Sequence, residues 1–347
     1  MSDASEKPAR RPRYQGSHPR TFHEKYKELN PARYTDEARK VLAAGKTPAG
    51  THRPIMVEEI LEVLAPQPGD FAVDATLGYG GHAAALLERV LPGGRVLALD
   101  VDPIELPKAE ARLRARDFPA GALLVRRSNF AGLPGLLAAD GLPPADIVLA
   151  DLGLSSMQID DPSRGFSFKR AGPLDLRMNP RRGQPAARLL ATLDAATLAG
   201  LLEANADEPH AAAVAHAVLE RQERTPITTT TDLADTVAET ILGQYGMEEA
   251  EQAIRRVFQA LRVAVNDEFG ALDAFLRVLP GCLKPGGRVA ILTFHSGEDR
   301  RVKQAFKAGL RAGRFSAVAD GVIRPGSDER RANPRASAAK LRWAVRR

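Results

Sequence analysis

The stretch DATLGYGGHA, Asp74 to Ala83, decides the fold of this chain. Its glycines at 78, 80 and 81 predict a turn whose backbone comes very close to another group, because glycine has no Cβ to hold that group away. The spacing Gly78-x-Gly80-x-x-Ala83 is one form of the dinucleotide fingerprint that joins a strand to a helix. From this stretch alone, a nicotinamide cofactor and S-adenosylmethionine (SAM) are both open.

The segments around the loop alternate between strand and helix. Buried strands are predicted in FAVDATL before the glycines and in RVLALDVD after them, and HAAALLERVL between them has the pattern of a helix. Two more strand-like runs follow, in ALLVRRSNF and DIVLADLGLSS. Such alternation predicts parallel βαβ units, in which ligands bind at the carboxyl ends of the strands.

The alternation stops near Asp160, and residues 160–257 show helical periodicity without strong strands. One long helix is then predicted through Phe258 and Leu279, followed by a turn and strand in LKPGGRVAILTF. We therefore predict an α/β, Rossmann-like sheet with an inserted helical domain. Its predicted parts are a basic leader (1–50), a core made of two segments (51–159 and 258–347), and the insertion (160–257).

Of the acidic residues at predicted strand ends, Asp74 favours SAM, whereas Asp100 indicates an adenosine ligand without separating the two cofactors. Asp74, directly before the glycines, would repel a pyrophosphate but can accept hydrogen bonds from the ammonium group of SAM. Asp100 lies 22 residues beyond Gly78, where a carboxylate can accept from both ribose hydroxyls. Phe130 follows the third strand, where an adenine would lie, and it either flanks the base or packs in the core. Asp102 is interpreted as a helix-start residue.

Asp151 closes the fourth strand and faces the place where a reaction would occur. It is the best candidate to accept the N–H of an attacking amine, although a carboxylate there can also serve only to orient the cofactor. After the last predicted strand, His295 and Ser296 are expected to point toward the cleft. Glu298 is expected in a solvated helix start.

Cysteine and histidine usage excludes several chemistries. Cys282 is the single cysteine, which excludes an internal disulfide and a cysteine-based zinc cluster, and the histidines show no H-E-x-x-H pairing. No metal is therefore expected. Methylation of a pyrimidine carbon usually needs a thiolate, and Cys282 is predicted far from the strand-four loop, so an exocyclic nitrogen is the better target.

Positive charge is concentrated at the two ends of the chain. Residues 1–50 carry 11 Lys/Arg against 6 Asp/Glu, and residues 301–347 carry 13 against 3, whereas the formal net charge of the whole chain is only +6. Such segments are typical of a phosphate-binding surface, although they can also be merely solvated. There is no run of apolar residues long enough for a membrane span and no signal peptide, so a cytoplasmic location is expected.

Taken in order, these motifs resemble a known family. THRPIMVEEIL, DATLGYGGHA, ALDVDP, the block from DIVLADLGLSSMQ to MNPRRGQPAA, and PGGRVAILTFHSGEDRRVK are similar to the bacterial small-subunit ribosomal RNA methyltransferase H family, over about residues 51–347. The resemblance implies a class I SAM-dependent methyltransferase fold. It also implies methylation of a cytidine N4 in the decoding centre of 16S rRNA, with the small ribosomal subunit as partner and the insertion helping to form the RNA groove. The implied SAM contacts are Gly80, Gly81, His82, Asp100, Phe130, Asp151 and Gln158.

The sequence also departs from that family. Gly297 stands where the family usually has leucine, and the leader is longer than in typical members, which suggests a paralogue with a shifted RNA target. A SAM-binding ribosome-assembly factor without turnover is an alternative, and a nicotinamide dehydrogenase is the third and weakest reading. Both a monomer and a homodimer are open.

Overall fold

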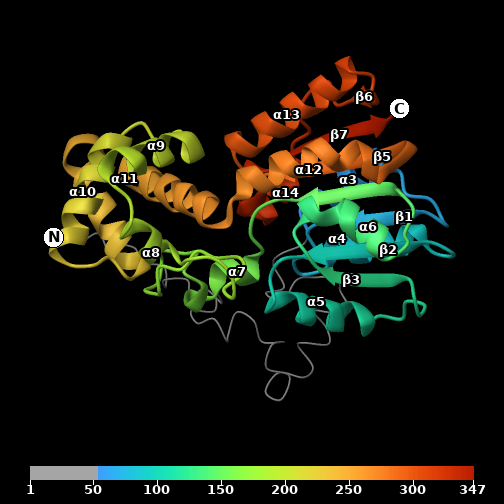
Figure 1. The fold of residues 1–347 in the computed structure, drawn as a ribbon, viewed down its shortest axis with the longest axis horizontal. Coiled ribbons are helices and arrows are strands. Elements are labelled where there is room, and N and C mark those ends of the chain that lie inside the picture. The colour runs from blue at the N-terminus through green and yellow to red at the C-terminus, as the bar shows by residue number, and fades with distance from the viewer. Residues whose placement is uncertain (1–53) are drawn as a thin grey trace, which may run out of the picture. The chain divides into compact units, whose positions relative to one another are not determined.

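The computed structural model describes residues 54–347, so the predicted leader lies outside the described residues (Figure 1). Its centre is a seven-stranded sheet in the order β3-β2-β1-β4-β5-β7-β6. The first five strands are parallel, and β7 runs antiparallel to both β5 and β6. The strands are β1 (Phe71–Asp74), β2 (Arg95–Asp100), β3 (Leu123–Arg127), β4 (Ala145–Asp151), β5 (Leu283–Thr293), β6 (Phe315–Val318) and β7 (Lys340–Arg346). The predicted α/β class is confirmed.

Helices cover both faces of the sheet, which is why its central strands are continuously apolar. Successive residues of β1 alternate between two separate cores: Ala72 belongs to one and Val73 to the other. The first core contains residues of α3 (Val57–Leu64), α4 (Gly81–Val90) and α5 (Glu105–Arg114). The second contains residues of α6 (Leu133–Ala139), α12 (Glu268–Cys282) and α13 (Ser296–Arg311).

A helical region lies between β4 and β5 and has an apolar core of its own. This third core runs from Phe166 to Leu261 and shares no residue with the other two. The predicted helical insertion is therefore observed, and its predicted boundary at residue 257 falls inside α11. The helices of the region are α7 (Ser156–Asp160), α8 (Ala186–Leu190), α9 (Ala195–Ala206), α10 (Ala211–Arg224) and α11 (Thr230–Asn266).

The single helix predicted through Phe258 and Leu279 is wrong, because two helices occupy this segment. Asp267 adopts a left-handed conformation with φ 49°, and its N–H is bonded back to the end of α11, which ends there before α12 starts at Glu268. Apolar residues keep a helical spacing on both sides of the break, so periodicity alone does not reveal it. A second interruption, at Gly246 (φ 85°, ψ 175°), divides α11 itself.

The edge strand β6 and its neighbour β7 were not predicted. β6 is only 4 residues long, and β7, KLRWAVR, is interrupted by charged residues. β7 pairs with β5 across about fifty residues of chain that contain α13. α14 (Ser327–Ala332) and three short 3-10 helices complete the described elements, the latter being η2 (Phe130–Gly132), η3 (Pro162–Arg164) and η4 (Pro334–Ala338). No helix among residues 54–347 is long and apolar enough to cross a membrane.

Candidate active site at the carboxyl edge of the sheet

The glycine loop connects β1 to α4 at the carboxyl edge of the sheet. Gly78 and Gly80 have φ of 51° and 93°, which favours glycine, and α4 begins at Gly81. A Cβ on Gly78 would find no atom closer than 3.9 Å, so the loop leaves space on that side. A Cβ on Gly80 would instead meet Leu113 of α5 at 3.1 Å. Gly80 is therefore needed for its positive φ and for packing against α5, and its predicted contact with SAM stays a prediction.

Asp100, at the end of β2, is connected to the same loop. Its Oδ2 accepts a hydrogen bond from the N–H of Gly78 at 2.8 Å, and its Oδ1 accepts one from the N–H of Asp102 at 2.9 Å. Burial raises the pKa of the Asp100 carboxyl above its ordinary value. A carboxylate offers about four acceptor positions, so Asp100 can still accept a hydrogen bond from a ribose hydroxyl.

The ends of β1 and β4 are joined through Thr76, which the sequence did not single out. Its N–H donates to Oδ1 of Asp74 at 3.1 Å, and its hydroxyl accepts from the N–H of Asp151 at 2.6 Å. His82, in the first turn of α4, brings its Nε2 to 3.4 Å from Oδ2 of Asp151. The glycine loop thus places three predicted site residues around one point: Asp74, His82 and Asp151.

This point is rich in polar atoms without partners. Within residues 54–347, two buried carboxylate oxygens here have no hydrogen-bond partner, Asp74 Oδ2 and Asp151 Oδ1, whereas His82 Nε2 faces Oδ2 of Asp151 at 3.4 Å. Buried polar atoms are rarely left unsatisfied unless a ligand or water completes them. Both atoms are carboxylate oxygens, so the group that completes them is a hydrogen-bond donor or a cation. The ammonium end of SAM fits this requirement, whereas a pyrophosphate does not.

The charges at this point influence one another. Burial raises the pKa of Asp74 to about 6, although the nearby His82 works in the opposite direction. Burial alone would lower the pKa of His82, but the carboxylates of Asp151 and Asp74 outweigh it and raise that pKa above the ordinary value. Both pKa values are thus shifted by burial and by the charged neighbours, and perturbed pKa values cluster at functional sites.

Phe130 and Gln158 lie at the margin of this arrangement. The Phe130 ring is half-buried and packs against Phe275 of α12, with 5.1 Å between ring centroids. Gln158 is buried in α7: its Oε1 accepts from the N–H of Ser155, and its Nε2 donates to Oδ2 of Asp102 at 2.7 Å. One amide hydrogen of Gln158 is left by these two bonds, so its predicted contact with SAM stays a prediction, as does that of Phe130.

The segment after β5 is more buried than expected. Glu298 is only 3% exposed; it accepts from the N–H of Phe294 at 2.9 Å, and its Oε1 lies 3.2 Å from Nε2 of His295. Burial would raise the pKa of Glu298, but His295 and Arg262 together hold it below the ordinary value. The expectation of a solvated helix start is thus wrong for Glu298, because β7 and α12 pack against this end of α13.

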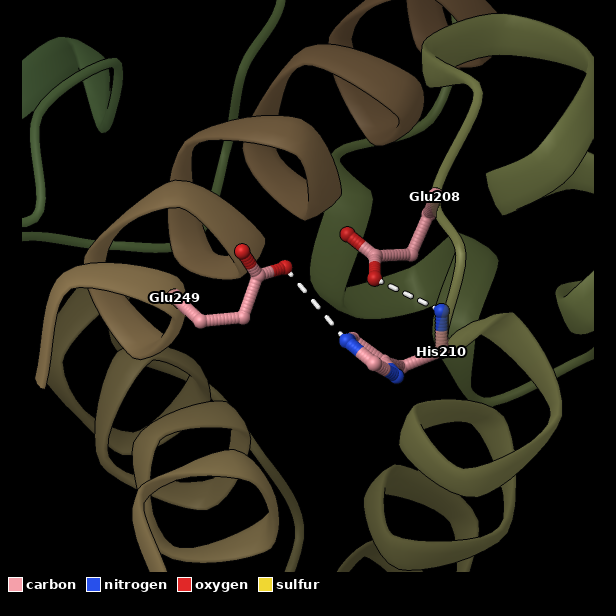
Figure 2. Close-up of side chains that lie close together, drawn as sticks. All are labelled: Glu208, His210 and Glu249. Carbon is pink, nitrogen blue, oxygen red and sulfur yellow. Dashed lines mark hydrogen bonds and ion pairs between the residues drawn. The ribbon is translucent and has the colours of Figure 1, made fainter. Parts of the chain in front are cut away.

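A cluster in the helical region resembles a metal-binding centre. Glu208, His210 and Glu249 lie close together in the helical region (Figure 2). However, Arg256 donates to Glu208 at 2.6 Å and also pairs with Glu249, so a guanidinium already balances both carboxylates.

The single cysteine is not a reactive centre either. Burial raises the pKa of the Cys282 thiol to about 11, which keeps it protonated and poorly nucleophilic at neutral pH.

The sheet order, the open glycine loop and the acidic residues at three strand ends define a class I SAM-dependent methyltransferase. More specifically, the chain belongs to the MraW methylase family, which matches residues 49–347. It is 48% identical to the ribosomal RNA small subunit methyltransferase H 2 of Alkaliphilus metalliredigens (strain QYMF), with 100% of both chains covered.

Two further relatives differ in how much of this chain they cover. The ribosomal RNA small subunit methyltransferase H 1 of Lachnoclostridium phytofermentans is 49% identical and covers 97% of this chain and 93% of its own length. The ribosomal RNA small subunit methyltransferase H of Thermomicrobium roseum is 42% identical and covers 85% of this chain and 94% of its own. The relatives from Alkaliphilus metalliredigens and Lachnoclostridium phytofermentans, whose names carry a number, therefore align over more of this chain than the relative from Thermomicrobium roseum.

Proposed function

We propose that this protein transfers a methyl group from SAM to the exocyclic N4 of a cytidine in 16S rRNA of the small ribosomal subunit. The observation that carries the proposal is the position of Asp151. Its carboxylate lies beside His82 and the glycine loop, and its Oδ1 is buried without a partner among the described residues. Membership of the methylase family supports the reaction type. The names of the relatives support the RNA substrate.

Each residue then has a distinct task. Asp100 would accept hydrogen bonds from the ribose hydroxyls of SAM, and Asp74 would accept one from its ammonium group. The loop glycines would let the backbone approach SAM closely. SAM supplies an electrophilic methyl carbon. Asp151 accepts an N–H of the cytidine amine, which aligns the lone pair and increases its electron density. His82, whose Nε2 lies 3.4 Å from Oδ2 of Asp151, orients that carboxylate.

Exposed cations support an RNA substrate. The loop of residues 169–183, which follows α7 and is named here the cationic loop, carries Lys169, Arg170, Arg181 and Arg182, and all four are exposed. Such side chains suit RNA phosphates. We propose that the insertion (160–257), which contains this loop, binds the RNA, that the leader (1–50) adds RNA contacts of its own, and that residues 51–159 and 258–347 form the catalytic core.

A ribosomal substrate also supports a cytoplasmic location for the protein.

The test is incubation of the protein with methyl-labelled SAM and small subunits from a strain that lacks the gene. Label should appear in one cytidine of 16S rRNA, and mass spectrometry of rRNA fragments should place the methyl group on N4. The matched control is Asp151→Asn, which should still bind SAM and RNA but should transfer the methyl group at least about 100-fold more slowly. Absence of label in cytidine would refute the proposal.

A shifted RNA target is the second candidate function. A Cβ on Gly297 would lie 2.5 Å from Cζ of Phe269, so Phe269 occupies the space that a larger side chain would need. This packing differs from what the leucine usual in the family would allow. The same mass-spectrometry experiment decides between the two candidates, because it identifies the labelled nucleotide. Binding to the subunit without label would instead favour an assembly factor.

A further inference from the structure

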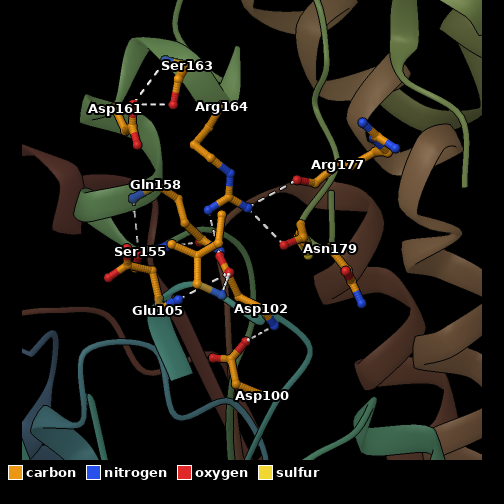
Figure 3. A network of polar contacts seen from close by, with 12 residues as sticks. Asp100, Asp102, Glu105, Ser155, Gln158, Asp161, Ser163, Arg164, Arg177 and Asn179 are labelled. Atoms are coloured by element: carbon orange, nitrogen blue, oxygen red, sulfur yellow. Dashed lines mark hydrogen bonds and ion pairs between the residues drawn. The ribbon is translucent and has the colours of Figure 1, made fainter. Parts of the chain in front are cut away.

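Asp102 is the centre of a buried network that the sequence did not reveal (Figure 3). Its side chain is fully buried, and its Oδ1 accepts from the N–H groups of Ile104 at 2.8 Å and Glu105 at 3.2 Å. These bonds agree with the predicted helix-start role. Its Oδ2 accepts from Nε2 of Gln158 at 2.7 Å and from Nη1 of Arg164 at 2.8 Å. Four hydrogen bonds therefore satisfy the carboxylate, and Arg164 supplies the opposing charge.

One branch of this network reaches the cofactor side. The N–H of Asp102 donates to Oδ1 of Asp100, whose other oxygen accepts from the N–H of Gly78. The position of Asp102 thus fixes the direction of the Asp100 carboxylate.

The other branch reaches the cationic loop. Nη2 of Arg164 donates to the carbonyl oxygens of Arg177 at 3.2 Å and Met178 at 2.8 Å. The N–H of Met178 in turn donates to Oδ1 of Asn266, the last residue of α11, at 2.7 Å. Arg164 therefore holds the backbone of the cationic loop between Lys169 and Arg181, where the exposed cations lie on either side.

We propose that Arg164 is a positioning residue for both substrates. Through Asp102 it orients Asp100 toward the ribose of SAM, and through the two carbonyls it holds the cationic loop against the RNA. The inference rests on the proposed function. Only arginine suits both tasks, because its planar guanidinium donates in several fixed directions, whereas a lysine presents a single point charge. The Arg164 side chain is only 6% exposed.

Three variants separate the two branches: Arg164→Lys, Arg164→Gln, and Arg164→Gln combined with Asp102→Asn. SAM affinity is measured by calorimetry without RNA, and the KM for small subunits is measured with labelled SAM. Arg164→Gln leaves the Asp102 carboxylate buried without a counter-charge, so SAM affinity should fall about tenfold or more and the KM for subunits should rise. Arg164→Lys keeps the charge but not the carbonyl contacts, so only the KM for subunits should rise.

The double variant tests the route through Asp102. Asparagine removes the buried charge and keeps an acceptor for the N–H groups of Ile104 and Glu105. SAM affinity should therefore recover to within about threefold of wild type, while the KM for subunits stays high. A purely structural role for Arg164 would not give this split between the two substrates. As a matched control, Arg256→Gln removes another arginine paired with a buried carboxylate, and it should lower the melting temperature without changing SAM affinity.

Several results would overturn the inference. These are wild-type SAM affinity in Arg164→Gln, equal effects of the lysine and glutamine variants on both substrates, or no recovery in the double variant. Thermal unfolding of each variant verifies that binding is measured on folded protein. If wild-type protein fails to label the subunit, the proposed function fails while the SAM-binding comparison still decides the Asp102 branch. If wild type labels the subunit and Arg164 variants match it, only this inference fails.

Discussion

SAM affinity should weaken as the pH is lowered from 7 to 5, because Asp74 takes up a proton in this range. Asp74 is buried at the end of β1, and its Oδ2 has no partner among residues 54–347. Burial raises its pKa to about 6. Since the folded-state pKa lies above the ordinary value, the protonated form predominates below about 6 and the ionised form above it. Only the ionised form can accept a charge-assisted hydrogen bond from the ammonium group.

The magnitude follows from that pKa. With a pKa of about 6, the ionised fraction of Asp74 is roughly 90% at pH 7 and roughly 10% at pH 5, so affinity should fall about tenfold, or about 1.4 kcal/mol. An α-amino group, with a pKa of about 7.7 to 8.0, stays charged over this interval. Asp100 and His82 also have raised pKa values, and their protonation acts in the same direction because it adds positive charge near a cationic ligand. Asp151, at the end of β4, is a further charged group that faces His82, at 3.4 Å.

The assay is isothermal titration calorimetry with SAM at pH 5, 6 and 7, without RNA. The matched control is Asp74→Asn, which keeps the shape of the side chain and cannot ionise. It should bind SAM more weakly at pH 7 and should show a flatter dependence on pH. Equal affinity of the wild type at pH 5 and pH 7 would refute the reasoning, and so would an unchanged slope in Asp74→Asn.

Three further predictions concern stability and RNA binding. Arg256→Met should lower the free energy of unfolding by about 3 kcal/mol in chemical denaturation, because Glu208 loses its counter-charge while its side chain has 0% exposure; a loss below about 1 kcal/mol would contradict this. Gly80→Val should abolish SAM binding in calorimetry, because a β-branched residue is strained at φ 93° and its Cβ would press on Leu113; retained affinity would show that the loop tolerates the strain. Deletion of residues 1–50 should weaken RNA binding and flatten its salt dependence without changing SAM affinity, whereas an unchanged slope in a salt titration would place the leader away from the RNA.

Local patterns in the sequence determined the parallel strands of the sheet and their binding edge. The glycine loop, the apolar runs of β1 to β4 and the helical periodicity after Asp160 depend on near neighbours in the chain, so they could be predicted without the structure. The same patterns placed Asp74, Asp100 and Asp151 at strand ends, and parallel strands end at one edge. The break at Asp267 could not be predicted, because a single left-handed residue does not disturb the apolar spacing around it.

Only the tertiary structure decided which of these residues act on one another. Asp102 meets Arg164 across 62 positions of sequence, and the N–H of Asp151 meets Thr76 across 75. Neither pairing has a local signal, because the residues come from segments that only the assembled sheet brings together. The raised pKa of Asp74 likewise depends on burial beneath elements distant in sequence. The chain therefore encodes its strand ends locally, whereas the charges and hydrogen bonds that make those ends a site arise from packing between remote segments.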